Sequence, residues 1–374
     1  MPALRNALAL GLLVAGSACH GGRDPSTEPQ SFDHGGYPSP PPLPTVEPPS
    51  SAPAVPVPVP PPAPPAAAPA GAGPPEGRYF RGGWIYQPIA NAPLHPESAA
   101  MTQWLEAHGG WGIGKMHIDF SIEVLEADAS TPRRRFQPTD EFYSPDCDRA
   151  NVPVPEGGAL EGETGYACRS DGDCHLIVRD RSSHRLFEMW RADIRGSTFR
   201  GGCLAVWDLT RIYGDVGRGE QCTSADAAGF PIAPLLFTAD EVASGEIRHA
   251  IRFILPNTRM RRGFYTRPAT HAGAPRAPAP APIYGGRWRL RADFDLASLP
   301  NEGARVVARA MQTYGMALAD GGNIALTAQS DRFTKHKWEG LLGSHDLYAL
   351  RPTDFEVIDT GPAIAATNDC VRAP

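Results

Sequence analysis

The stretch His117-Ile-Asp-Phe-Ser-Ile-Glu-Val-Leu125 alternates polar and apolar side chains from His117 to Val124. The apolar side chains at every second position are Ile118, Phe120, Ile122 and Val124. Successive side chains of a β-strand point to opposite faces, so a period of two predicts a strand over residues 117–125. The expected strand buries one face and leaves the other face polar.

The same period recurs in short segments separated by turn residues. Residues 175–180 and 185–192 flank the polar run Arg181-Ser-Ser-His184, which predicts a hairpin. Further strands are expected at residues 204–209, 247–255 and 287–294. Such regular alternation predicts a mainly β fold, a β-sandwich or jelly-roll-like arrangement in which sheets pack on each other.

Three short helices complete the predicted elements. Thr238-Ala-Asp-Glu241 has the form of a capping box before a helix, and residues 302–318 and 96–107 show helical spacing of apolar side chains. Three helices are too few to connect the strands of a large parallel sheet, so a doubly wound α/β fold is not expected. The proline-rich residues 274–282 are expected to form a surface loop.

The N-terminus has the form of an export signal. Arg5 is followed by an apolar run and then by small residues before Cys19, which predicts a signal peptide over residues 1–18. Leu13-Val-Ala-Gly-Ser-Ala-Cys19 resembles the lipobox of bacterial lipoproteins, which implies lipidation of Cys19. The protein is then expected in the cell envelope, attached to a membrane by acyl chains and facing the periplasm or the cell surface. Simple secretion is the alternative.

A proline-rich segment separates this signal from the folded part. Residues 21–77 contain 20 of the 41 prolines, and proline fixes φ and removes backbone donors. Residues 19–77 are therefore expected to form the lipidated start and an extended polyproline II tether without a core. The remaining residues, 78–374, are expected to form a single β-rich globular domain.

The charge balance bears on possible partners. The chain has 35 Lys and Arg against 41 Asp and Glu, and residues 1–77 hold 2 and 5 of these, which leaves 33 against 36 in residues 78–374. A balance so near neutral argues against a nucleic-acid partner. No apolar run of about 18 residues follows the first twenty, so no membrane-spanning helix is expected.

Six cysteines besides Cys19 are expected to form up to three disulfides, as in other exported domains. The predicted pairs are the two local ones, Cys168–Cys174 and Cys203–Cys222, and by elimination Cys147–Cys370. Zinc binding is not expected, because no Cys-x-x-Cys occurs and His175 begins a strand-like run.

Motifs with a known mechanism are absent from the sequence. There is no Gly-x-Ser-x-Gly elbow, Walker loop, His-Glu-x-x-His or EF-hand loop, and no cofactor or metal is expected. Gly110-Trp-Gly-Ile-Gly114 lacks the spacing and context of a dinucleotide-binding fingerprint. Asp171-Gly-Asp173 is interpreted as a turn and not as a calcium site.

Polar groups inside apolar segments provide the candidate catalytic residues. These candidates are Glu188, Asp208, Asp226, His249 and His271. A carboxylate in an apolar strand tends to have a raised pKa, which suits a general acid. The alternative is that these residues are structural. His249 is then a core histidine with a hydrogen-bond partner, and His271 is a surface histidine. The three carboxylates then face solvent or pair with arginines.

Four segments resemble a group of secreted bacterial proteins, some of which occur beside carbohydrate-active modules. The segments are Cys222-Thr-Ser-Ala-Asp-Ala-Ala-Gly-Phe-Pro-Ile232, His249-Ala-Ile-Arg-Phe253, Pro268-Ala-Thr-His271 and Tyr314-Gly-Met-Ala-Leu-Ala-Asp320. The similarity extends over residues 84–359. The group has no settled activity, so the resemblance implies export and one compact module, and it marks Asp226, His249 and His271 as motif members.

These observations lead to the hypothesis of an exported lipoprotein that engages extracellular or cell-envelope polysaccharide, with seven Trp and ten Tyr as possible stacking surfaces. A glycoside hydrolase requires two carboxylates among Glu188, Asp208 and Asp226 to flank the bond. A polysaccharide lyase would use His249 or His271 as base and Tyr314 as acid. The alternative is a non-enzymatic binding or structural module. The enzyme requires at least three of the candidates to line one open pocket.

Overall fold

In the computed structural model, the alternating stretch at residues 117–125 forms two strands that belong to two different sheets. β1 (Ile118–Ile122) lies at the edge of a six-stranded sheet, and β2 (Val124–Ala127) lies at the edge of a four-stranded sheet. Only Glu123 separates them. A single strand was predicted here, but the chain passes from one sheet to the other and ties them together.

The structure describes residues 79–170 and 172–373, all of which fall within one compact unit, Ala67–Pro374. The predicted signal peptide, the lipidation site at Cys19, the tether and Asp171 lie outside the described residues. None of the helices in the described ranges is long and apolar enough to cross a membrane.

The six-stranded sheet has parallel and antiparallel neighbours. In spatial order its strands are β1, β16 (Leu326–Gln329), β12 (Ile251–Leu255), β15 (Met316–Gly321), β14 (Arg287–Leu290) and β17 (Phe355–Val357). β1 is parallel to β16 and β12 is parallel to β15, whereas β14 is antiparallel to both of its neighbours. β12 and β15 lie at the centre and are buried along most of their length, as expected for strands covered on both faces.

The four-stranded sheet contains the predicted hairpin. In spatial order its strands are β10 (Cys203–Asp208), β7 (Arg185–Trp190), β6 (Leu176–Asp180) and β2. β6 and β7 are antiparallel, and β2 runs parallel to β6. The turn between β6 and β7 is stabilised by the carboxylate of Asp180, which accepts hydrogen bonds from the hydroxyls of Ser182 and Ser183, both at 2.6 Å. The hairpin is confirmed.

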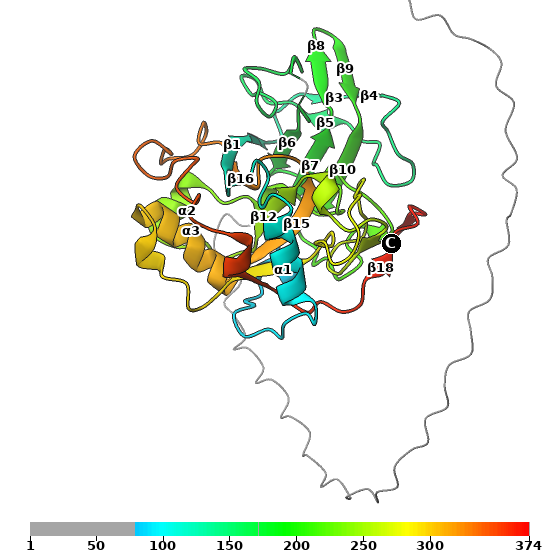
Figure 1. Ribbon diagram of the computed structural model, residues 1–374. Coiled ribbons are helices and arrows are strands. Elements are labelled where there is room, and N and C mark those ends of the chain that lie inside the picture. The colour runs from blue at the N-terminus through cyan, green and yellow to red at the C-terminus, as the bar shows by residue number, and fades with distance from the viewer. Residues whose placement is uncertain (1–78, 171, 374) are drawn as a thin grey trace, which may run out of the picture. The chain divides into compact units, whose positions relative to one another are not determined.

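Alternation along these strands buries both faces of the four-stranded sheet. Ile177, Leu186 and Trp207 belong to the main core, which the sheet shares with β12 and β15. Val178 and Phe187, one residue along, pack in a second apolar cluster on the other face. Figure 1 shows β6, β7 and β10 next to the six-stranded sheet. The fold is mainly β and consistent with a sandwich, as the alternation predicted.

Shorter strands form the remaining small sheets of the described residues. They pair as β11 (Gly219–Glu220) with β19 (Val371–Arg372), β13 (Phe264–Tyr265) with β18 (Ile364–Ala365), β3 (Arg133–Arg134) with β5 (Val152–Pro153), and β4 (Gln137–Pro138) with β9 (Thr198–Gly201) and β8 (Asp193–Arg195). The sheet containing β8 and β9 projects at the top of Figure 1.

The described part of the chain has three α-helices, near the predicted positions. They are α1 (Ser98–Ala107), α2 (Ala239–Ser244) and α3 (Glu302–Thr313), and the 3-10 turns are η1 (Trp84–Tyr86), η2 (Ala233–Leu235), η3 (Asn257–Arg259), η4 (Leu296–Ser298) and η5 (Pro352–Asp354). The capping box of α2 is confirmed by hydrogen bonds in both directions between Thr238 and Glu241. The predicted helix 302–318 was too long. Gly315 has a φ of +70°, and a Cβ there would lie 2.5 Å from a backbone oxygen, so the chain turns and enters β15.

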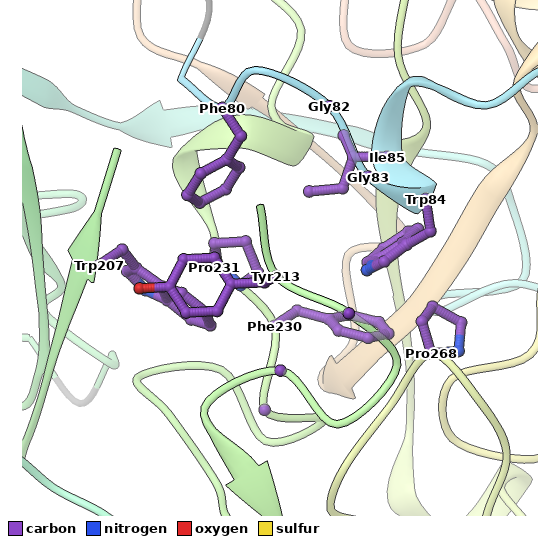
Figure 2. A pocket seen from close by; sticks show the side chains of 13 residues that line it. Phe80, Gly82, Gly83, Trp84, Ile85, Trp207, Tyr213, Phe230, Pro231 and Pro268 are labelled. Atoms are coloured by element: carbon purple, nitrogen blue, oxygen red, sulfur yellow. The ribbon is translucent and has the colours of Figure 1, made fainter. Parts of the chain in front are cut away.

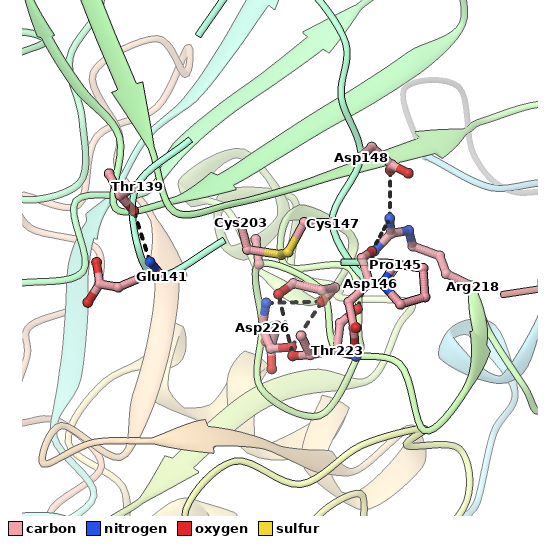
Figure 3. Close-up of a disulfide and its surroundings, with 12 residues drawn as sticks. Thr139, Glu141, Pro145, Asp146, Cys147, Asp148, Cys203, Arg218, Thr223 and Asp226 are labelled. Atoms are coloured by element: carbon pink, nitrogen blue, oxygen red, sulfur yellow. Dashed lines mark hydrogen bonds and ion pairs between the residues drawn. A yellow bond between two sulfur atoms is a disulfide. The ribbon is translucent and has the colours of Figure 1, made fainter. Parts of the chain in front are cut away.

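The cysteines pair as Cys147–Cys203, Cys168–Cys174 and Cys222–Cys370. The pair Cys168–Cys174 is confirmed, whereas the predicted pairs Cys203–Cys222 and Cys147–Cys370 are wrong. The Asp148 amide donates to the Leu204 carbonyl at 2.7 Å, which places residue 147 beside the start of β10 (Figure 3). β19 pairs with β11 and brings residue 370 to residue 222. Strand pairing, and not distance along the chain, selects the partners, and three disulfides agree with an exported protein.

The two disulfides that differ most in loop length are expected to differ in their contribution to stability. Cys222 and Cys370 are 148 residues apart, and Cys168 and Cys174 only 6. Loop-closure entropy predicts that replacing the first pair by serine lowers the free energy of unfolding by about 5 kcal/mol and replacing the second by about 2 kcal/mol. Urea unfolding measures both values. Equal losses, or a non-reducing peptide map joining Cys203 to Cys222, would contradict this pairing.

Candidate functional site

A buried arginine lies at the centre of the six-stranded sheet. Arg252 on β12 is 3% exposed, and its apolar neighbours in sequence point to the opposite face, into the core. Its Nε donates to Asp226 Oδ2 at 2.7 Å, and its two Nη atoms lie 3.3 Å from Thr327 Oγ1 and from Asp320 Oδ2. We call these four residues the Arg252 network.

The carboxyls of this network have raised pKa values. Burial raises the pKa of Asp226, although Arg252 opposes the shift. Burial and the nearby Asp226 carboxylate together raise the pKa of Asp320 to about 7. The side chain of Asp226 is fully buried, whereas 20% of the Asp320 side chain is exposed. Asp320 is therefore accessible to solvent and partly protonated at neutral pH.

Asp320 opens into a pocket of about 480 Å³, which we call the Asp320 pocket. Polar and aromatic residues around it include Tyr143, Asp173, Trp190, His271 and Tyr284. The Trp190 Nε1 donates to Asp173 Oδ1 at 2.9 Å, so a second carboxylate is held next to an aromatic ring. The pocket therefore presents the carboxyl groups of Asp173 and Asp320 together with the Trp190 ring.

Ala227 connects the two titratable side chains of the pocket. Its amide lies 3.2 Å from Asp320 Oδ2, and its carbonyl accepts a hydrogen bond from His271 Nδ1 at 2.8 Å. Because a carbonyl oxygen only accepts, Nδ1 of His271 is the donor in this hydrogen bond, and Nε2 is the ring nitrogen left for other contacts. The side chains of Asp320 and His271 are thus held by the N–H and the C=O of one residue.

A second buried ion pair supports the segment that carries Asp226 and Ala227. His175 Nδ1 lies 2.6 Å from Glu161 Oε2, and its Nε2 lies 3.1 Å from the Ala225 carbonyl oxygen. Burial lowers the pKa of His175, but Glu161 outweighs this effect and raises the pKa to about 9. The imidazole is therefore protonated at neutral pH, and both of its N–H groups have acceptors. This pair fixes the backbone just before the Arg252 network.

The four segments quoted for their resemblance to secreted bacterial proteins meet at this site. They contribute Asp226, Arg252, His271 and Asp320, one residue each. Sequence reasoning missed two of them. Arg252 is a polar residue in an apolar strand, and this same signal singled out His249, three residues earlier, instead. Asp320 is the last residue of the fourth segment. To choose Arg252 over His249, one has to know which face of β12 lies against Asp226 and Asp320.

Glu188 is a structural residue. It lies on the core face of β7, is fully buried and does not line the Asp320 pocket. Its carboxylate accepts from Trp207 Nε1 at 2.9 Å and from the amides of Ile232 and Ala233 at 2.9 and 2.8 Å. Burial raises its pKa to about 7, although these donors favour the carboxylate. Its burial and its three donors support the structural reading of Glu188 rather than the catalytic one.

Asp208 and His249 also lie away from the Asp320 pocket. Asp208, at the end of β10, lines a different hollow, and hydrogen bonds from Thr210 lower its pKa. His249 is fully buried, with Nδ1 2.8 Å from the Ala250 carbonyl oxygen and Nε2 3.4 Å from the Glu241 carboxylate. Its structural reading, a core histidine with partners, is the one the geometry supports.

The requirement that three of the five candidates share one pocket is not met. His271 lines the Asp320 pocket and Asp226 lies buried beside it in the Arg252 network, while Glu188, Asp208 and His249 lie elsewhere. Tyr314, the predicted acid of a lyase, caps the end of α3 and does not line the pocket. The five candidates therefore do not form an enzyme site, as the non-enzymatic alternative expects, and any enzymatic proposal has to rest on other residues of the pocket, Asp320 and Asp173.

The tryptophans contribute less to the site than their number suggested. Trp111, Trp207, Trp288 and Trp338 are buried in the core. Trp190 is the tryptophan that lines the Asp320 pocket. Trp84 and Trp207 converge with other rings on a hollow of about 20 Å³ (Figure 2). That volume admits about one water molecule, so this hollow is a packing feature and not a ligand site.

Two groups of potential metal ligands occur in the described residues. Asp146 lies with Cys222 and Cys370, and Glu163 lies with Cys168 and Cys174. All four cysteines are joined in disulfides, so no thiolate is available in either group.

Comparison of the chain with protein-family models gave no match, and comparison with curated proteins and with solved structures gave none either. The chemistry of the Asp320 pocket is therefore the basis for assigning a function.

The structural role of Glu188 predicts a loss of stability on a conservative change. In Glu188→Gln, an amide NH2 group faces backbone and indole N–H donors, so we expect the free energy of unfolding to fall by about 1–3 kcal/mol. Glu126→Gln, at an exposed position of the edge strand β2 in the same sheet, is the matched control, because its pair with Arg181 is exposed and is worth at most about 1 kcal/mol. Urea unfolding measures both. A loss no larger than that of the control would disprove the structural role.

Proposed function

We propose that this protein is an exported carbohydrate-active enzyme that hydrolyses a glycosidic bond in the Asp320 pocket. The observation that carries the proposal is a carboxyl with a pKa of about 7, exposed to an open pocket of about 480 Å³. A second carboxylate, Asp173, and an aromatic ring, Trp190, line the same pocket. A carboxyl that keeps its proton near neutral pH fulfils the main requirement for a general acid in glycoside hydrolysis.

The proposed reaction assigns one step to each side chain. The sugar stacks on Trp190, and Asp320 gives its proton to the bridging oxygen as the bond between that oxygen and the anomeric carbon breaks. Water adds to the anomeric carbon and gives its proton to the Asp173 carboxylate. The new Asp320 carboxylate is stabilised by Arg252 and by the amides of Ala227 and Gly321.

A second candidate reaction is β-elimination of a uronate-containing glycan. The favouring observation is that His271, with Nε2 left for other contacts, and Tyr284 line the same pocket. His271 would remove the proton at C5, and the Tyr284 hydroxyl would protonate the leaving oxygen. Elimination forms a double bond in the product, whereas hydrolysis adds water and forms none, so product spectroscopy distinguishes the two reactions.

Replacement of the general acid is the direct test of hydrolysis. On any glycan cleaved in a screen of plant, algal and bacterial-envelope polysaccharides, we expect Asp320→Asn to lower kcat by about 100-fold or more, because the amide has no proton to transfer at neutral pH. Asp128→Asn, at an exposed turn, serves as the control and should keep full activity. Reducing-end assays measure both. Binding without any product would support the non-enzymatic alternative instead.

The pH profile tests the role of Asp226 as a positioning residue. The acid must be protonated, so activity should fall as pH rises through about 7, the pKa of Asp320. In Asp226→Asn a neighbouring negative charge is lost and Arg252 interacts more fully with Asp320, which lowers the pKa of that carboxyl. The basic limb of kcat against pH should then move to lower pH. An unchanged limb would show that Asp226 does not influence the acid.

A further inference from the structure

A second, strongly basic hollow lies apart from the Asp320 pocket. Two adjoining pockets, of about 380 and 520 Å³, share Arg149 and Ala150 in their walls. The first is formed by the ends of β7 and β10 with the segments around Arg218 and Arg372, and the second lies beside Phe136. We call the two together the basic groove. Because the pockets share one wall, the groove is longer than a site for a single small ion.

Arginine dominates the charge of this groove. Its arginines are Arg135, Arg149, Arg185, Arg211, Arg218 and Arg372, and its carboxylates are Asp148 and Asp208. Asp148 is already engaged by Arg218 at 2.6 Å and by Arg372 at 2.9 Å (Figure 3 shows the first pair). Asp208 accepts hydrogen bonds from Thr210. The positive charge is therefore compensated only in part.

Several guanidinium groups have unused donors. Within residues 79–170 and 172–373, Arg135, Arg149 and Arg185 form no ion pair, although all three are exposed. The guanidinium of Arg149, which lines both pockets, lies over the Phe142 ring at 4.5 Å from the ring centre. The Arg218 side chain is only 3% exposed, and its Nε has no hydrogen-bond partner among the described residues.

We propose that the basic groove binds a linear glycan that carries carboxylate or sulfate groups. Guanidinium groups bind both anions through paired hydrogen bonds, and the length of the groove suits successive units of a polymer. A bilayer presents a flat surface, which does not enter a concave groove. Single-stranded nucleic acid requires stacked aromatic platforms, whereas the rings lining this groove are the half-buried Tyr213 and the buried Phe136.

The groove and the Asp320 pocket lie on two sides of one short segment. Tyr143 and Asp146 line the pocket, and Asp148 and Arg149 line the groove. The disulfide at Cys147 fastens the segment between them (Figure 3). The binding inference does not require cleavage, because it rests on the charge of the groove alone.

Binding is tested on the full chain carrying Asp320→Asn, so that no polymer is cut and a failure of the proposed hydrolysis leaves the test intact. The probes are polygalacturonate for carboxylates, dextran sulfate for sulfates and neutral dextran. In this background, Arg149→Gln/Arg185→Gln removes two exposed charges from the groove. Arg262→Gln/Arg276→Gln removes two exposed charges elsewhere and is the control. Calorimetry at low and moderate salt measures Kd.

We expect polygalacturonate or dextran sulfate to bind, more weakly as salt increases, and neutral dextran not to bind. The Kd of the charged polymer should rise about tenfold or more in the groove variant and remain unchanged in the control. Equal binding by the two variants, no binding of either charged polymer, or binding of neutral dextran would overturn the proposal. Tighter binding of single-stranded DNA or of anionic vesicles than of the glycans would also overturn it.

Discussion

The ion pair between Arg252 and Asp226 is the constraint on which the site depends. A cation buried in the middle of a β-sheet is tolerated only with carboxylates close to it, and Asp226 and Asp320 provide them at 2.7 and 3.3 Å. These three residues come from β12, from β15 and from the loop before η2. The pairing therefore holds that loop against the sheet and determines where the pocket can form.

The same contacts give the site its chemistry. Two carboxyls that share one guanidinium cannot both ionise as easily as in water, and the more exposed one, Asp320, keeps its proton to about pH 7. The Ala227 amide holds the carboxyl of Asp320, and the Ala227 carbonyl accepts from Nδ1 of His271 and so orients its ring. In this protein the interaction that holds the buried arginine also places a carboxyl with a raised pKa at an opening of the surface.

The segment around Cys147 connects the two proposed sites. Its disulfide to Cys203 at the start of β10 holds Tyr143 and Asp146 at the pocket and Arg149 at the basic groove. Acidic and basic residues are unevenly distributed over the surface. A domain whose net charge is near zero can for this reason carry a strongly basic hollow. The overall charge, which argued against a nucleic-acid partner, contained no information about this local excess.

The sequence by itself determined the class of fold, the hairpin of β6 and β7, the capping box of α2 and the local disulfide, because each depends on residues close together in the chain. Of the five candidate residues that the sequence offered, His271 lines the Asp320 pocket and Asp226 lies beside it. Only the tertiary structure decided that the stretch after His117 divides between two sheets, how the other cysteines pair, and that Arg252 rather than His249 contacts Asp320 at the pocket. Those outcomes depend on strand pairing and burial across large sequence separations, which alternation along one segment does not encode.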